Sequence, residues 1–489
     1  MLSSLTGMEV GVFNTRKIFF LLLFLELVLL GIILFGDYQK FALYAGILCA
    51  PILIFLDPTI GLALMVITTS LDIIGYITSG TEGFKYLNIT YFHFALTLTF
   101  LSTISSVLKR QKMHIPSANI WPPLLAFLFL YSISLIWTPD IKEASIFILR
   151  IIVLSLTVLM ILMNIDRIWK FSFFVGILIA VPLVVAIITL YQFFSEGSIF
   201  APIVMKMANA LGLPVYRSTG TFSNPNTLAC FLMAGATLAF GLLFAKGIPS
   251  IFRVALLATF ITIILGLISS FSRGGWVSTM GAICLVVVFH KKWSYFGYFA
   301  IFLIFCLFII SIKTPQMYAV VFDRIGTIVN AGEDASSSAR ISLIKSSIAM
   351  WLDHPILGVG LRGFPVEFST YIDPGMPRIL REINEAHTIQ FEILAETGII
   401  GLTISTWLMM TVLFHGLRTM RSLKNQTLRC LQIGFLALFI GYIINFTFAT
   451  DLLNNIFWMV IGMIYTIPLL DNKISLRQVS FESPQTTPG

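Results

Sequence analysis

The chain has 489 residues, of which 57% are hydrophobic and only 11% are charged, and its mean hydropathy is +0.94. Soluble domains carry about a quarter charged residues, so this composition excludes an ordinary soluble protein and indicates a polytopic membrane protein. The net charge of +8 does not indicate a nucleic-acid partner, because membrane proteins retain basic residues in their cytoplasmic loops. No nucleic-acid partner is therefore expected.

Fourteen apolar runs are long enough to cross about 30 Å of hydrocarbon. Backbone groups in lipid must be satisfied within the segment, so long and uniformly apolar runs predict helices rather than barrel strands. The predicted spans are 18–35, 40–56, 59–79, 87–108, 120–137, 144–163, 169–194, 222–245, 250–270, 274–290, 294–312, 388–416, 428–448 and 452–470. Two pairs of runs are closely spaced, 40–56 with 59–79 and 274–290 with 294–312. A total of twelve or thirteen spans therefore remains possible. The predicted fold class is all-α, an integral membrane protein with about 12–14 transmembrane helices.

Lysine and arginine are concentrated in alternate short loops, which places those loops and both termini in the cytoplasm. The long polar loop then lies outside, and one large extracytoplasmic loop is predicted. This topology divides the chain into five parts. They are a cytoplasmic N-terminus (1–17), a transmembrane helix bundle (18–312), the large loop (313–387), C-terminal transmembrane helices (388–470) and a cytoplasmic tail (471–489).

The large loop contains a concentration of ionisable side chains that apolar helices would not tolerate in lipid. A helix is predicted over residues 339–351, with a cap at residues 336–338. Its apolar face would rest on the membrane or on the roof of the bundle; that face consists of Ile341, Ile344, Ile348 and Trp351. The following segment, 358–363, matches G-x-G-x-x-G, but no strand precedes it, so a tight backbone turn is favoured over nucleotide binding.

The predicted topology places three cations near helix ends on the same outer side: Arg217, Arg273 and His387. Guanidinium groups are planar and permanently charged, so two of them at a membrane surface suit a phosphate or diphosphate. A histidine could accept a proton from a hydroxyl. The alternatives are interfacial arginines that only snorkel, and a histidine bonded to the loop backbone. Glu26 and Asp72 would mark an ion pathway or form pairs within the bundle.

Several kinds of chemistry lack their usual sequence marks. We find no D-x-D, H-E-x-x-H or G-x-S-x-G motif, and the five cysteines show no C-x-x-C pairing. No metal site and no cofactor are therefore expected.

Four pieces of the sequence, spanning about residues 215–402, occur in an order that resembles a known family. They are Arg217-x-x-Gly220-x-Phe222-x-x-Pro225-Asn226, Ser272-Arg273-Gly274-Gly275, Arg340 with Trp351 followed by Gly358-x-Gly360-x-x-Gly363-Phe364, and Ala386-His387 with Glu392, Glu396-Thr397-Gly398 and Gly401. Here the chain resembles the O-antigen ligase and polymerase-like family of bacterial envelope glycosyltransferases. Over its whole length it is similar to membrane proteins of teichuronic acid biosynthesis in Gram-positive bacilli. That similarity favours polymerisation of a wall polysaccharide over ligation to lipid A.

The resemblance implies a metal-independent transferase that acts at the outer face of the bacterial cytoplasmic membrane. Its partners would be a glycan donor linked to undecaprenyl diphosphate, a glycan acceptor, membrane lipid and other envelope polysaccharide assembly proteins. Carried over by motif, Arg217 and Arg273 would hold the diphosphate and His387 would activate the acceptor hydroxyl. Arg340, Asn226 and Arg362 would contact or support the substrate.

Two other classes of function remain open. Fourteen spans also suit a flippase or transporter of a lipid-linked oligosaccharide or polysaccharide. However, the charges are concentrated in one external loop, and no internal repeat is visible. A scaffold within an envelope assembly complex is the remaining alternative.

Overall fold

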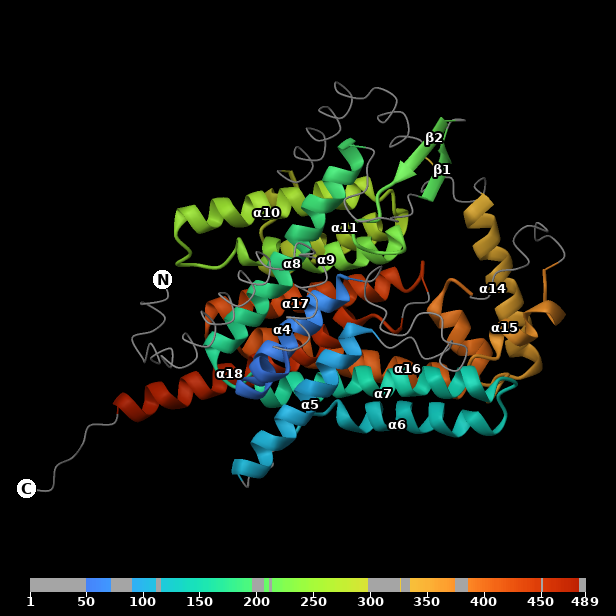
Figure 1. Cartoon of the computed structure of the whole chain (residues 1–489), viewed down its shortest axis with the longest axis horizontal. Coiled ribbons are helices and arrows are strands. Elements are labelled where there is room, and N and C mark those ends of the chain that lie inside the picture. The colour runs from blue at the N-terminus through green and yellow to red at the C-terminus, as the bar shows by residue number, and fades with distance from the viewer. Residues whose placement is uncertain are drawn as a thin grey trace, which may run out of the picture.

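The computed structural model describes residues 50–71, 90–110, 116–195, 206–210, 213–297, 326, 335–373, 386–449 and 452–482 (Figure 1). The expected span 18–35, most of the span 294–312, and both Glu26 and Asp72 lie outside these ranges. Within them, eight helices are long and apolar enough to cross a membrane. The predicted polytopic, helical membrane fold is therefore confirmed.

The eight candidate spans coincide with eight of the predicted apolar runs. They are α5 (Tyr91–Arg110), α7 (Ile141–Asn164), α8 (Ile168–Ser195), α9 (Pro225–Leu242), α10 (Ser250–Ser269), α11 (Arg273–His290), α16 (Ile389–Ser422) and α17 (Gln426–Asn445). The remaining described elements are α4 (Pro58–Thr69), α6 (Trp121–Ile133) with η1 (Ser134–Ile136), α14 (Ala335–Asp353), α15 (Phe364–Glu367), η2 (Phe368–Thr370) and α18 (Asn455–Glu482). A two-stranded antiparallel hairpin, β1 (Lys206–Ala210) and β2 (Leu213–Arg217), precedes α9 and was not predicted.

The closely spaced pair of predicted spans near residue 57 is separated by a helix cap. Residues 50–56 are helical, and α4 begins at Pro58. The Asp57 side chain accepts a hydrogen bond from the backbone N of Thr59 (3.0 Å). Proline at the first helical position has no N–H to satisfy. Asp57-Pro58 therefore ends one helix and begins the next without leaving an exposed donor.

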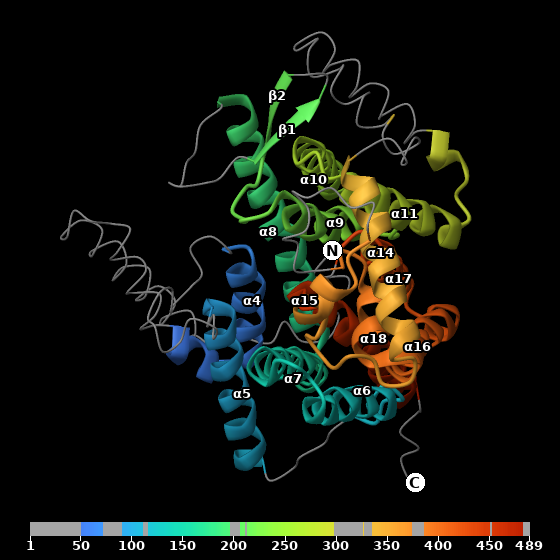
Figure 2. The same ribbon diagram turned by 90° about the vertical axis from the view of Figure 1, so that its right-hand side faces the viewer.

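Among the eight candidate spans, α9 has the largest buried share, and it packs against α8, α10, α11 and α17 (Figure 2). Small residues allow this approach: a Cβ added at Gly241 would lie 3.4 Å from the Cα of Gly434 on α17. Close backbone contact between small residues is the usual packing mode of helices in membranes, where lipid removes the hydrophobic drive for association. Accordingly, α9 forms the centre against which the site helices are held.

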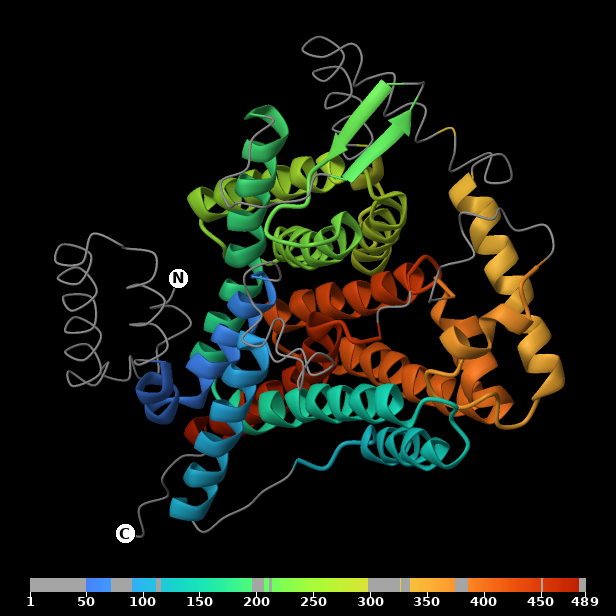
Figure 3. The same ribbon diagram turned by 45° about the vertical axis from the view of Figure 1, so that its right-hand side comes forward.

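A second group consists of α6, α7 and α16, with α14 inclined steeply to α16 at one end (Figure 3). The helix predicted over 339–351 lies within α14, but α14 begins at Ala335, so the predicted cap at residues 336–338 lies inside the helix. The face turned to the protein is not the one formed by Ile341, Ile344, Ile348 and Trp351, and contact of that face with the membrane stays a prediction. Leu343 and Met350 are fully buried, whereas Ile341 is 47% exposed. Leu343 and Met350 share a hydrophobic cluster with Ala395 of α16.

The end of α14 is tied to the segment that follows η2. The Tyr371 hydroxyl donates a hydrogen bond to Asp353 Oδ2 (2.9 Å), and this bond to a carboxylate raises the pKa of Tyr371 above its usual range. Lys345 pairs with Asp373 (3.5 Å). These contacts close the loop back onto α14.

Helix α16 is interrupted at Gly398, whose φ of 63° and ψ of −163° are not helical. The segment before α15 hydrogen-bonds across this break. The backbone N atoms of Val359 and Gly360 donate to the carbonyls of Ala395 (3.0 Å) and Glu396 (2.9 Å), and Ile399 N donates to Pro355 O (3.0 Å). A break inside a membrane helix needs such partners, because lipid offers none. The G-x-G-x-x-G segment thus donates backbone hydrogen bonds to α16 beside this break.

Substituting Gly398 by alanine is expected to lower the free energy of unfolding by about 2 kcal/mol or more, because this φ, ψ region is accessible essentially only to glycine. An added Cβ would also collide with the Ile356 carbonyl oxygen. Thermal unfolding of the purified protein in detergent measures the change. Gly176→Ala in α8 is the matched control, since its Cβ would meet nothing within 4 Å. Equal melting temperatures for the two variants would contradict this account of the break.

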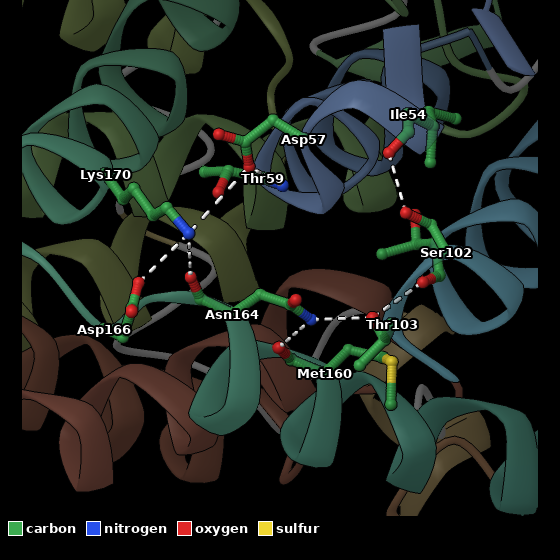
Figure 4. Close-up of polar contacts among 10 residues, drawn as sticks. Ile54, Asp57, Thr59, Ser102, Thr103, Met160, Asn164, Asp166 and Lys170 are labelled. Carbon is green, nitrogen blue, oxygen red and sulfur yellow. Dashed lines mark hydrogen bonds and ion pairs between the residues drawn. The ribbon is translucent and has the colours of Figure 1, made fainter. Parts of the chain in front are cut away.

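A polar network ties α4, α5, α7 and α8 together at the C-terminal end of α7 (Figure 4). Lys170 pairs with Asp166 (3.0 Å) and Asp57 (3.9 Å), and its Nζ donates to Asn164 O (3.1 Å). The Asn164 amide donates to Thr103 Oγ1 (2.9 Å). A helix of 24 residues is about 36 Å long, so this network lies far from the N-terminus of α7.

Candidate functional site

Arg217 lies at the end of β2, where its guanidinium bridges the segments leading into two helices. Its Nε donates to the carbonyl of Ser270 (3.0 Å), and its Nη2 donates to Asn226 Oδ1 (3.0 Å). Ser272 Oγ donates to the same Asn226 oxygen (2.9 Å). Asn226 is in the first turn of α9 and Ser272 caps α11. The structure therefore joins Arg217 and Asn226 to the residue directly before Arg273.

The local sequence explains why this junction forms. Asn224 caps α9 by accepting a hydrogen bond from Asn226 N (2.9 Å), and Pro225 occupies the first helical position. Ser272 caps α11 in the same way, by accepting from Gly275 N (3.3 Å). Two helix N-termini with partial positive charge thus begin beside Arg217 and Arg273. Such an arrangement attracts an anion.

His387 lies just before the first turn of α16 and is half-buried. Its φ of 54° is in the left-handed region, which is uncommon for a residue with a side chain. The backbone on either side is fixed. Ala386 N donates to Glu392 Oε2 (3.2 Å), and Ile389 N donates to Phe446 O (3.0 Å). The backbone that carries the imidazole is therefore held by bonds to α16 itself and to the end of α17.

One turn, at residues 446–448 after α17, connects the arginine junction to the histidine. Phe446 O accepts the hydrogen bond from Ile389 N (3.0 Å), and a Cβ added at Gly274 would lie 2.9 Å from the Cβ of Phe448. Asn445, the last residue of α17, donates to Ser278 Oγ of α11 (3.2 Å). Gly274, which follows Arg273, and Ile389, two residues after His387, therefore adjoin the same turn at the end of α17.

Arg362 has protein partners on the other side of His387. Its Nη1 lies 3.7 Å from Glu392 Oε1, and its guanidinium lies over the Phe147 ring at 5.7 Å from the centroid. Arg340 lies in the second turn of α14 and is half-buried. A direct role of Arg362 or Arg340 toward substrate stays a prediction.

The site contains functional candidates to which the sequence alone assigned no role. Glu392 is 8% exposed and Glu396 is 4% exposed, both within α16, and Glu396 Oε1 accepts from Phe364 N (3.3 Å). Gln192 of α8 is completely buried. An ionisable or strongly polar residue in an apolar run is a recognisable signal, so these positions were detectable, whereas their partners were not.

The Glu392 carboxylate is shared between Arg362 and the backbone before His387, so Glu392→Ala is expected to lower activity about tenfold or more. Removing one member of a buried pair leaves the other unpaired. The double variant Glu392→Ala, Arg362→Ala should therefore be no less active than Glu392→Ala. Initial rates of Glu392→Ala, Arg362→Ala and the double variant, measured at equal protein, check the coupling. Losses that simply multiply would contradict a shared role.

Within the described ranges, no group of three or more His, Cys, Asp or Glu side chains is arranged to hold a metal ion. The expected independence of metal stays a prediction.

Residues 258–406 match the family described as O-antigen ligase. This range contains Arg273, Arg340, Arg362 and His387, whereas Arg217 and Asn226 precede it. A comparison with curated proteins found no match. Among solved structures, a chain from work on polymerisation and crosslinking by a peptidoglycan synthase complex is similar over 73% of this chain and 97% of its own length. The two chains share 14% sequence identity, and the TM-score is 0.40.

Proposed function

We propose that this membrane protein, with its O-antigen ligase family domain at residues 258–406, is a glycosyltransferase. It joins glycan units linked to undecaprenyl diphosphate to a glycan acceptor. The observation that carries the proposal is the junction at which Arg217, Asn226 and the Ser272-Arg273 helix start meet. His387 adjoins the same end of α17.

In the proposed reaction, the oxygen of an acceptor hydroxyl attacks the anomeric carbon of the donor sugar. The bond between that carbon and the diphosphate oxygen breaks, and the diphosphate leaves with the electron pair. The hydroxyl proton passes to the imidazole of His387, which acts as the general base. Arg217 and Arg273, together with the N-termini of α9 and α11, stabilise the negative charge that develops on the diphosphate.

The guanidinium groups take the role that a divalent cation has in many diphosphate sites, so the proposed reaction needs no metal. The distribution of lysine and arginine supports cytoplasmic termini and an outward-facing site. We further propose that the product is a cell-wall polysaccharide such as teichuronic acid, extended by polymerisation. Other envelope polysaccharide assembly proteins would then be partners.

The rival function is a flippase for the same class of lipid-linked glycan. It is favoured by the many candidate spans and by the charged Asp57–Lys170 network inside the bundle. A transporter would depend on such internal charges and tolerate the loss of His387. The proposed enzyme has the opposite dependence, because the network lies at the far end of α7 from the site.

The test uses protein purified in detergent, a lipid-linked oligosaccharide donor and EDTA. We expect wild-type protein to produce longer glycans, which gel electrophoresis resolves, and expect His387→Ala to produce none. Absence of product from wild type, together with donor translocation in liposomes, would replace the enzyme by the flippase.

A further inference from the structure

Gln192 is a fully buried amide in α8, one of the candidate membrane spans. Its side chain bonds twice to a single residue. Oε1 accepts from Gly220 N (2.8 Å), and Nε2 donates to Gly220 O (3.0 Å). Burying an amide without partners costs several kcal/mol in an apolar medium. Both ends of the Gln192 amide are thus matched to one point of the backbone.

Gly220 belongs to the turn between Arg217 at the end of β2 and α9, which begins at Pro225. Its φ of +60° is in the left-handed region, and an added Cβ would lie 2.6 Å from Thr189 Oγ1. The glycine is therefore required both by the backbone conformation and by the approach of α8. Only a residue without a side chain lets the Gln192 amide reach this backbone.

The hydroxyl groups at the centre of the turn do not hold it by hydrogen bonds to other described residues. The hydroxyl oxygens of Ser218, Thr219 and Thr221 are buried and make no hydrogen bond among the described residues. The turn is held by its backbone instead: Ser218 N donates to Ser269 O (3.2 Å), and Gly220 bonds to Gln192. Gln192 thus fixes the centre of the turn from a helix that precedes the matched family domain.

We propose that Gln192 is a positioning residue for the diphosphate site: it fixes the Gly220 turn and thereby sets Arg217 against Asn226. This inference rests on the proposed function, in which Arg217 binds the donor diphosphate. Arg217 precedes Gly220 by three residues, and its guanidinium reaches Asn226 and Ser270 (both 3.0 Å) only if the turn keeps its shape. Misplacing a group by about 1 Å can lower the rate of an enzyme reaction about a hundredfold.

The test compares two buried glutamines. Gln192→Met and Gln432→Met each replace a completely buried amide in a membrane helix, so both should lower stability. Gln432 bonds to Thr419 Oγ1 (2.9 Å) and Ile464 O (3.3 Å). It lies about 21 Å along α17 from Phe446.

Rates are measured against the concentration of the lipid-linked oligosaccharide donor. We expect Gln192→Met to raise the donor KM about ten- to a hundredfold and Gln432→Met to leave it at the wild-type value. Gln192→Asn, which keeps the amide but is one methylene shorter, should give an intermediate KM and serves if the methionine variant does not fold. The double variant Arg217→Ala, Gln192→Met should have the KM of Arg217→Ala, because Gln192 acts through Arg217.

Two results overturn the inference in distinguishable ways. If Arg217→Ala raises the donor KM while the Gln192 variants match Gln432→Met, the arginine binds donor and the positioning role of Gln192 is wrong. If Arg217→Ala itself leaves the donor KM unchanged, the proposed diphosphate site fails and the inference fails with it.

Discussion

Replacing His387 by alanine is expected to lower kcat by about 10²- to 10⁴-fold, the usual contribution of a general base. Alanine cannot accept the proton that the acceptor hydroxyl loses as it attacks the donor sugar. The donor KM should change little, because in the proposed site the arginines, and not His387, bind the diphosphate. Product formation in detergent at saturating donor measures kcat, and titration of the donor measures KM.

His354→Ala is the matched control for that experiment. His354 belongs to the same large loop but is exposed just after the end of α14, so its removal should leave kcat at the wild-type value. Equal activities of His387→Ala and wild type would exclude His387 as the base. Equal losses in both histidine variants would point to a general disturbance of the loop.

Arg273→Ala is expected to lower kcat by about 10²- to 10³-fold, the loss typical of removing one group that stabilises developing negative charge. Arg273 begins α11, so its guanidinium and the helix N-terminus act on the same anion. Lysine at this position should restore only part of the rate, because it keeps the charge but lacks the planar fork of donors. Single-turnover measurements with a preformed donor complex separate this loss from weaker donor binding.

Arg253→Ala controls for the general loss of a cation. Arg253 is exposed at the start of α10, about 25 Å along that helix from Ser270, whose carbonyl binds Arg217. We expect its removal to leave kcat unchanged. A rate for Arg273→Ala within twofold of that for Arg253→Ala would remove Arg273 from the proposed charge stabilisation.

The helical membrane fold was predictable because hydrocarbon imposes a local rule. Any spanning segment must be apolar over about 20 residues and must form its backbone hydrogen bonds internally. The helices α7, α8 and α17 could therefore be predicted from their composition. The candidate cations could also be predicted, since Arg217, Arg273 and His387 each lie near the start of a predicted helix. What the sequence did not provide was the bond of Arg217 to Asn226, or the turn at residues 446–448 that adjoins Gly274 and Ile389.

Other features depend on contacts between segments distant in the chain. Hydropathy predicts α16 as one helix, yet Gly398 breaks it because the backbone at residues 355–360 supplies replacement hydrogen bonds. The face of α14 that packs on the protein contains Leu343 and Met350, and hydropathy alone did not distinguish it from the face that contains Ile341.

Sequence by itself therefore determined the membrane environment, most of the helices and the types of residue available for chemistry, since hydropathy and charge act locally. Tertiary structure alone decided which polar groups meet: Gln192 with Gly220, Arg217 with Asn226, and Glu392 with the backbone before His387. Each of these pairs is directional and requires particular helices to pack at particular heights. Residue type predicts the need for a partner, and only packing selects it.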